Sequence, residues 1–444
     1  MQPIVLGDGQ NRFALVPNDD GMLYTVRVDT GAIIAAWMPQ VWLDRLSSAP
    51  PDGLWQEDGH AMTGGVAAIP SGNGYLVAGT GAEGRFHYAL LLNGDGTLAR
   101  VLATRYEVDL ATPTYGAPVL LGVEGRTLVL FLEGDEKRQT GNLVVWQWDG
   151  NALTEAITPL SSTPTSDLFT DAALGHCDGM PTLFFAGKGG SNHQLYKVTV
   201  DAAGNPTVTQ LFALPAPVNT NHAPVRYWTT GVSANSGKRY VALVASDALT
   251  QARAATNRED FLLVYEINGS PCNASAWLPS FFASMSDSGR WSNRAYQSRP
   301  CRGAQCASGT KETVQTIGGR ITGKPAIWEN TLFLPVSVGF AEAQCSASAY
   351  LYPYRLDEAT KIGAISDKEF TVSYHDAGGE QTKNYKEENI LLGSSGAAYS
   401  PQVVNPGGSG QQKLVGASGS GPAVISVGVK PSGKRLMWRE IIFE

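Results

Sequence analysis

The chain has 444 residues, of which 43% are hydrophobic and 16% charged, and it contains 50 glycines and 25 prolines. Frequent turn-forming residues and few charges favour short strands over long solvated helices, so we expect an all-β fold. The formal net charge of −7 disfavours nucleic acid as a partner, because phosphate binding needs concentrated lysine and arginine.

The sequence contains neither a predicted membrane span nor a predicted signal peptide. No apolar run approaches the ~20 residues that a membrane span needs, and Met1-Gln2-Pro3 does not begin a signal peptide. Strand-like sequence starts by Arg12. We therefore interpret residues 1–444 as the excised C-terminal domain of a larger protein, whose export signal lies upstream.

The stretch NDDGMLYTVRVDTGAIIAAWMPQVWLDRL, from Asn18 to Leu46, predicts a β-hairpin. Asp20-Gly21 turns the chain, and residues from Met22 to Val28 alternate faces as in a strand. Asp29-Thr30-Gly31 turns the chain again, and a second strand returns from Ala32.

A similar unit recurs along the chain. It has a glycine or alanine before an apolar strand, often with proline, then a short turn and two further strands. Further units start near Gly64, Gly116, Gly179, His222, Gly323 and Ser400. Together with the opening hairpin they make about seven units spaced roughly fifty residues apart, a period typical of β-propellers. We therefore predict a single β-propeller of about seven blades, in which radial packing buries the faces that each small sheet leaves open.

Two segments break this period, near residues 271–319 and 366–392, and are predicted to be insertions between blades. The first is rich in serine, and between Asp287 and Lys324 the sequence has seven basic and two acidic residues. Arginine and aromatic residues dominate many interfaces. The candidate partner-binding residues are Arg290, Trp291 and Arg294. The alternative is that this insertion is a disulfide-stapled cover over a blade edge.

Five cysteines, four of them in or beside this insertion, favour an oxidising compartment. They are Cys177, Cys272, Cys301, Cys306 and Cys345. The short segment from Cys301 to Cys306 closes easily into a loop. Among the three pairings of the last four cysteines, we therefore prefer Cys301–Cys306 with Cys272–Cys345, which leaves Cys177 reduced.

No motif in the sequence indicates catalysis. There is no Gly-x-Ser-x-Gly elbow, phosphate-binding glycine loop or His-Glu-x-x-His pair. The six histidines are scattered, and surface or turn positions are expected for them. We predict no catalytic residues and no enzymatic activity, although propellers can assemble a site from several blades without a local motif.

Three segments resemble one family, in the same order along the chain. The opening stretch from Asn18 resembles the start of the C-terminal domain of the PilC/PilY type IV pilus tip-associated proteins. YLVAGTGAEGRFHYALLL, from Tyr75 to Leu92, is similar to that family's glycine-rich strand pair. The stretch from Gly318 to Gly363 resembles its Gly-Glu-Arg-x-x-x-x-Pro stretch, followed by a strand, a cysteine and a strand ending in Asp-x-x-Thr-Gly.

The resemblance implies a non-enzymatic pilus biogenesis factor and tip-associated adhesin, which supports pilus assembly, surface attachment and twitching motility. Its expected location is extracellular, at the pilus tip or bacterial cell surface, after export through the periplasm. Expected partners are minor pilins or the pilus tip complex, with a host or abiotic surface as a further class. No cofactor is expected.

One feature departs from the family, whose members often carry a calcium loop in a middle blade. The matching positions here are Leu174, His176, Asp178 and Thr182. Calcium prefers six to eight oxygen ligands, several of them carboxylates, so this degenerate loop is predicted to hold no metal.

Two other functional classes stay open. One is a carbohydrate- or protein-binding propeller of another lineage. The other is a quinoprotein-type dehydrogenase, because propellers of that class also use Asp-x-x-Thr-Gly turns. Such an enzyme needs a cofactor-stacking aromatic residue, a cation site and an arginine clamp. None of these is identifiable in this sequence.

Overall fold

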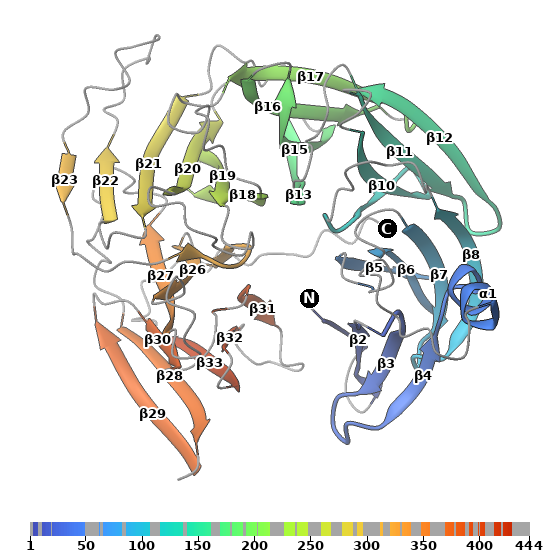
Figure 1. Cartoon of the computed structure of the whole chain (residues 1–444), viewed down its shortest axis with the longest axis horizontal. Helices are drawn as coiled ribbons and strands as arrows, with labels where there is room; N and C mark the ends of the chain where they lie inside the picture. The colour runs from blue at the N-terminus through green and yellow to red at the C-terminus, as the bar shows by residue number, and fades with distance from the viewer. Residues whose placement is uncertain are drawn as a thin grey trace. The chain divides into compact units, whose positions relative to one another are not determined.

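The structure is a computed structural model that divides into two compact units, Met1–Pro215 and Ala216–Glu444. Both consist almost entirely of β-strands (Figure 1). The structure describes residues 3–7, 11–18, 20–48, 62, 65–81, 86–106, 116–135, 140–160, 169–177, 180–189, 192–201, 203–213, 226–235, 238–246, 259–267, 278–286, 291–295, 311–313, 320–328, 331–338, 348–355, 369–376, 379–386, 390–393, 398, 400–404, 413–418 and 421–428.

The first unit contains four antiparallel sheets, each a meander of four strands in chain order, as in propeller blades. Blade 1 consists of β1 (Ile4–Leu6), β2 (Phe13–Pro17), β3 (Leu23–Arg27) and β4 (Ile33–Trp37). Blade 2 consists of β5 (Val66–Ser71), β6 (Gly74–Gly81), β7 (Phe86–Asn93) and β8 (Leu98–Tyr106). Blade 3 consists of β9 (Val119–Val123), β10 (Arg126–Asp135), β11 (Thr140–Trp148) and β12 (Leu153–Leu160). Blade 4 consists of β14 (Ala173–Cys177), β15 (Met180–Gly189), β16 (Asn192–Val200) and β17 (Pro206–Ala213), and the short strand β13 (Phe169–Asp171) precedes it.

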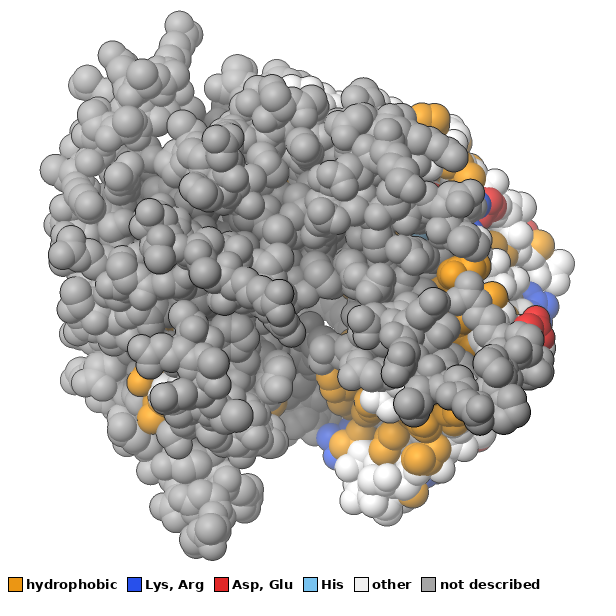
Figure 2. All heavy atoms as spheres, in the orientation of Figure 1, with side chains coloured by type: hydrophobic (Ala, Val, Ile, Leu, Met, Phe, Trp, Pro, Cys, Tyr) orange, Lys and Arg blue, Asp and Glu red, His pale blue; other side chains and the backbone are white. Residues whose placement is uncertain are grey.

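The opening hairpin is confirmed, with β3 and β4 as its strands. Alternation in blade 1 buries Phe13, Leu15 and Leu23 on one face. The other face carries Val5 and Ile33 in one cross-strand row, and both are exposed. Figure 2 shows hydrophobic side chains at the lower right, where the strands of blade 1 lie.

The same kind of turn joins the third and fourth strands of all four blades. A glycine with positive φ occurs in each of these turns, at Gly31, Gly96, Gly150 and Gly204. In blades 2 to 4 an aspartate carboxylate accepts a backbone N–H hydrogen bond within the turn, at 2.7 to 2.9 Å. Such a carboxylate satisfies amides that the reversing chain leaves unpaired. The Asp-Thr-Gly pattern of the opening stretch is therefore one instance of a turn that recurs from blade to blade.

Apolar clusters hold the successive blades of the first unit face to face. Blades 1 and 2 share the cluster of Phe13, Leu15, Leu23, Val77, Phe86, Tyr88 and Leu90. Blades 2 and 3 share the cluster of Leu76, Ala78, Ala89, Val129, Phe131, Val144 and Trp146. Blades 3 and 4 share the cluster of Leu121, Leu128, Leu130, Leu143, Leu183, Phe185 and Tyr196. Because inner blades are covered on both faces, their strands read as nearly continuous apolar runs rather than as alternating ones.

Helix α1 (Gln40–Ser48) follows the opening hairpin and has no counterpart among the sequence predictions. Its Trp42 is fully buried, with ring centroids 5.5 Å from Phe86 and 5.6 Å from Tyr106. The helix therefore covers one end of the cluster between blades 1 and 2.

The second unit contains three sheets. Blade 5 continues in chain order through β18 (Arg226–Asn235), β19 (Lys238–Ser246), β20 (Glu259–Ile267), β21 (Leu278–Ser286), β22 (Trp291–Ala295) and β23 (Lys311–Thr313). A second sheet contains β24 (Arg320–Ile321), β25 (Ala326–Trp328), β26 (Thr331–Val338), β27 (Ser348–Arg355) and β30 (Ile390–Gly393). The third contains β28 (Glu369–Asp376), β29 (Gly379–Lys386), β31 (Gln402–Val404), β32 (Lys413–Ser418) and β33 (Gly421–Gly428).

The chain is thus an all-β propeller. Among the described residues, five of its seven sheets are meanders of consecutive strands and form blades, so the prediction of about seven blades is wrong. The last two sheets are not meanders of consecutive strands. The hairpin of β28 and β29 lies between β27 and β30 in the sequence, yet β28 pairs with β33 of the other sheet. Periodicity along the chain does not reveal this exchange, because the spacing between strands is nearly unchanged by the choice of pairing partner.

The two predicted insertions both contribute strands to sheets. Segment 271–319 contains β21, β22 and β23, which extend the sheet outward from β20. Segment 366–392 contains β28, β29 and most of β30. That the whole chain forms one propeller domain cut from a larger protein stays a prediction.

Candidate functional site

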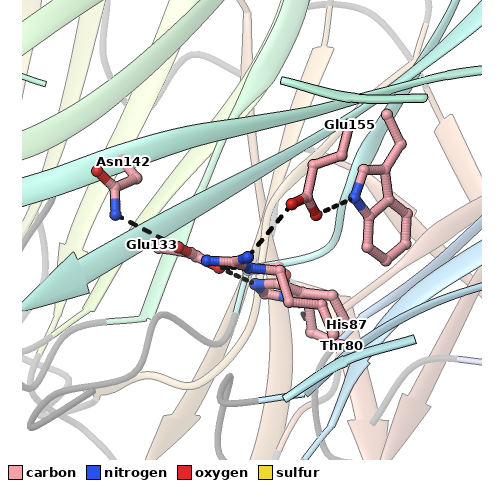
Figure 3. Close-up of polar contacts among 8 residues, drawn as sticks. Thr80, His87, Glu133, Asn142 and Glu155 are labelled. Carbon is pink, nitrogen blue, oxygen red and sulfur yellow. Dashed lines mark hydrogen bonds and ion pairs between the residues drawn. The ribbon is translucent and has the colours of Figure 1, made fainter. Parts of the chain in front are cut away.

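A buried charge network lies between blades 2 and 3 (Figure 3). Glu133 on β10 is at its centre, and its side chain is only 1% exposed. Its Oε1 accepts hydrogen bonds from His87 Nε2 on β7, at 3.1 Å, and from Arg105 Nε on β8, at 3.0 Å. Asn142 Nδ2 on β11 is 3.5 Å from its Oε2. One carboxylate of blade 3 therefore accepts from two strands of blade 2.

Arg105 extends the network toward the surface. Its Nη1 lies 3.4 Å from Glu155 Oε1 on β12, so one guanidinium bridges two carboxylates. Glu155 Oε2 accepts a hydrogen bond of 2.7 Å from the buried indole of Trp146. The side chain of Arg105 is 18% exposed and that of Glu155 is 38% exposed. The network thus runs from the solvent-inaccessible carboxylate of Glu133 to the partly solvated carboxylate of Glu155.

The position of His87 follows from the apolar strands around it. Its ring stacks on Phe131 with centroids 4.4 Å apart, and Phe131 shares a face of β10 with Glu133. An ionised carboxylate only accepts hydrogen bonds, so His87 Nε2 carries the shared hydrogen. Its Nδ1 is buried without a hydrogen-bond partner in the part of the chain that the structure describes.

Burial and hydrogen bonding act on Glu133 in opposite directions. Burial by itself raises the pKa of a carboxyl group, because it disfavours the charged form. Hydrogen bonds and electrostatic attraction from His87 and Arg105 outweigh burial and lower the pKa of Glu133 to about 2. Glu133 is therefore ionised at neutral pH and cannot act there as a general acid.

The geometry indicates a clamp between blades rather than a reaction centre. Substrate could not reach Glu133 without opening the interface, since Glu133 and His87 are both closed to solvent. A buried ion pair fixes which groups face each other, and removing one partner leaves an uncompensated charge. The network therefore fixes the register of blade 2 on blade 3.

Acid should weaken this clamp. Because the pKa of Glu133 is about 2 in the folded protein, against an ordinary 4.5, its stabilisation is fully present above pH 4.5. It is lost as the pH falls from about 4.5 toward 2. We expect the urea midpoint of the parent to fall over this range more steeply than that of Glu133→Gln. Parallel pH profiles for the two proteins would contradict this assignment.

Two of the three candidate partner-binding residues lie on one described strand. Trp291 and Arg294 both lie on β22, paired with Met285 and Phe282 of β21 respectively. Arg290 lies outside the described residues. That these residues bind a partner stays a prediction.

The degenerate calcium loop spans β14 and β15. Leu174 on β14 is exposed, whereas Thr182 on β15 is buried and donates its hydroxyl to the Met180 carbonyl at 3.0 Å. His176 lies on β14, and Asp178 lies outside the described residues. Within the described ranges, no three metal-binding side chains come together. That the loop holds no metal stays a prediction.

The disulfide predictions fall where the structure gives no description. Cys177 is the last residue of β14. Cys272, Cys301, Cys306 and Cys345 all lie outside the described residues, so both preferred pairings stay predictions.

Sequence reasoning missed the network at Glu133. Surface or turn positions were expected for the histidines, and for His87 this is wrong, since it is 1% exposed in β7. A signal was present, because His87 in FHYALLL and Glu133 in TLVLFLE each interrupt an apolar strand. Buried ionisable groups need partners, so two such interruptions in neighbouring blades indicate a pair.

Comparisons with known proteins add similarities of architecture. No protein family model and no curated protein matches this chain. Among solved structures, the extracellular domains 1–2 of Drosophila Semaphorin 1a are 10% identical, covering 96% of this chain and 85% of that chain, with a TM-score of 0.43. Saccharomyces cerevisiae Sqt1 is 9% identical, covering 95% and 94%, with a TM-score of 0.43.

A quinoprotein alcohol dehydrogenase-like protein from Bacteroides thetaiotaomicron is also similar. It is 11% identical, covering 80% of this chain and 64% of that chain, with a TM-score of 0.38. At these identities and TM-scores, the matches carry no information about function.

None of the helices in the described part of the chain is long and apolar enough to cross a membrane. The functional conclusion therefore depends on the residues themselves.

Proposed function

We propose that this chain is a propeller domain of the PilC/PilY type, acting as a non-enzymatic binding module in type IV pilus biogenesis and tip-associated adhesion. Its partners are minor pilins or the pilus tip complex, together with a host or abiotic surface. The proposed location is extracellular, at the pilus tip or cell surface. No cofactor or metal is part of the proposal.

The opening segment is the observation that carries the proposal. Its order of turn, strand, Asp-Thr-Gly turn and strand resembles the start of the family's propeller domain. The chain builds this segment as β3 and β4 with the turn at Gly31 between them. The later glycine-rich pair that resembles the family forms β6 and β7 of the next blade.

The character of the polar network supports a non-enzymatic role. Catalytic groups must reach a substrate, and an acid or base near neutral pH needs a pKa near that range. Glu133 meets neither condition, because it is closed to solvent and its pKa is about 2. The charged groups of this network form hydrogen bonds between blades 2 and 3.

A pull-down tests the proposed function. The purified chain is immobilised and incubated with sheared pili and recombinant minor pilins from the organism that carries this gene. We expect retention of the minor pilins above the level of an immobilised propeller from an unrelated protein. In parallel, the absorbance spectrum after addition of pyrroloquinoline quinone should show no bound cofactor.

The alternatives give distinct outcomes. No retention of pili or pilins, with binding to an oligosaccharide or an unrelated protein, would indicate a propeller of another lineage. A stoichiometric quinone spectrum with dye-linked alcohol oxidation would indicate a dehydrogenase. Either result would overturn the proposal.

A further inference from the structure

Two Asn-Gly pairs lie side by side at one end of blade 2. Asn73-Gly74 closes the turn between β5 and β6, and Asn93-Gly94 opens the turn between β7 and β8. Gly74 pairs in register with Asn93, and a Cβ added at Gly94 would lie 2.9 Å from the Asn73 carbonyl oxygen. Both asparagines are exposed. The two pairs therefore share one environment and differ in how the backbone holds them. A third Asn-Gly pair, at residues 268–269, lies outside the described residues.

An asparagine that precedes a glycine can lose its amide group by internal attack. The backbone nitrogen of the glycine bonds to the asparagine Cγ, and the bond from Cγ to Nδ2 breaks. Nδ2 leaves as ammonia with the hydrogen of the attacking nitrogen, and a succinimide ring remains. Water then opens the ring at either carbonyl, which gives aspartate or isoaspartate. Glycine favours this reaction because it has no side chain beside the attacking nitrogen.

The attacking nitrogen is free at Gly94 and held at Gly74. Among the described residues, Gly94 belongs to no strand and its N–H forms no hydrogen bond. Gly74 is a strand residue instead, paired with Ser71 on one side and with Asn93 on the other. Ring closure removes the N–H, so at Gly74 it would disrupt the ladder, whereas at Gly94 no hydrogen bond is lost.

The equivalent turn of blade 4 carries the product residue. In both turns the first residue donates its N–H to the carbonyl of the fifth, and the fourth donates its N–H to the carbonyl of the first. The first residue is Asn93 in blade 2 and Asp201 in blade 4. The Asp201 carboxylate accepts a hydrogen bond from the Asn205 N–H at 2.7 Å. An aspartate at position 93 therefore fits this backbone, whereas isoaspartate lengthens the main chain by one carbon and does not.

We propose that Asn93-Gly94 is a site of spontaneous deamidation in the folded protein, and that Asn73-Gly74 is protected by strand pairing. The site goes beyond the proposed function and does not depend on it. Modification places a second carboxylate beside Asp95, since both side chains contact the Thr97 hydroxyl. The isoaspartate form also lengthens a turn that packs on blade 1 through Gly96. The contact between blades 1 and 2 is therefore expected to loosen as the protein ages.

Peptide mapping of the aged full chain by mass spectrometry tests this proposal. The purified protein is kept folded at neutral and at mildly alkaline pH, sampled over weeks and digested. A methyltransferase specific for isoaspartate labels the modified peptides. We expect product to accumulate at Asn93, faster at the higher pH because attack needs the deprotonated nitrogen, while Asn73 stays unmodified. In the chain unfolded in urea, both asparagines should react at similar rates, since each precedes a glycine.

Three variants complete the test. Asn93→Gln should abolish labelling of its peptide, because the longer side chain disfavours ring closure. The matched control Asn73→Gln should leave the time course at Asn93 unchanged. Asn93→Asp reproduces the aspartate product and should change the melting temperature by less than about 2 °C. The aged parent, which contains isoaspartate, should melt below this variant.

The outcomes decide between protection by structure and a general property of the dipeptide. Equal modification of Asn73 and Asn93 in the folded protein would overturn the proposal. So would an Asn93 that reacts only after unfolding in urea. An aged, modified parent that melts like the fresh protein would overturn the loosening of blades 1 and 2.

Discussion

Replacing Glu133 with Gln is expected to lower the free energy of unfolding by about 3 kcal/mol. Removing one partner of a buried ion pair typically costs ~3–5 kcal/mol, because the other charge stays buried without compensation. Glutamine keeps one oxygen that can accept from His87 and Arg105, now at 3.1 and 3.0 Å, but it removes the negative charge that compensates the Arg105 guanidinium. We place the effect at the lower end because Arg105 is 18% exposed and keeps its contact with Glu155. Urea unfolding at pH 7, with the midpoint and slope fitted together, measures this difference.

Glu155→Gln is the matched control in the same network. Glu155 is 38% exposed, and its glutamine replacement retains an oxygen to accept from Trp146. Exposed ion pairs contribute about 0–1 kcal/mol, so this variant should lose less than about 1 kcal/mol. Equal losses in the two variants would show that charge at Glu133 does not hold blades 2 and 3 together.

Replacing Gly96 with Ala is expected to cost roughly 2–5 kcal/mol of stability. Gly96 has a φ of 87°, a left-handed conformation in which a Cβ costs about 1–2 kcal/mol. An added Cβ would also lie 3.0 Å from Phe13 Cγ and 3.2 Å from Ile34 Cδ1, in the packed contact of this blade 2 turn with blade 1. Overpacking of this kind costs about 1–3 kcal/mol.

Gly150→Ala separates the two causes. Gly150 occupies the equivalent turn of blade 3 with a φ of 94°. Among the described residues, apart from its two chain neighbours, no atom lies within 4 Å of the position that an added methyl group would occupy. Only the backbone cost applies there, so a loss of about 1–2 kcal/mol is expected. Denaturation of both variants under one set of conditions checks the comparison. A Gly150→Ala loss as large as that of Gly96→Ala would show that the turn of blade 2 does not pack tightly on blade 1.

The local elements of this protein could be predicted from its sequence. Alternation after Asp20-Gly21 predicts the strand that forms β3, and Asp29-Thr30-Gly31 predicts the turn before β4. Both follow from neighbouring residues, because turn geometry and strand alternation depend on a few adjacent dihedral angles. The recurrence of such units was enough to predict an all-β propeller.

Pairing between distant strands was decided only by the tertiary structure. The hairpin of β28 and β29 joins the sheet of β33, and the chain has five blades rather than about seven. Glu133 and His87 are 46 residues apart, and only the packing of blade 3 on blade 2 brings them to 3.1 Å. Sequence determines which residues can turn, alternate or be buried, whereas the partners across an interface depend on free energies summed over many non-local contacts.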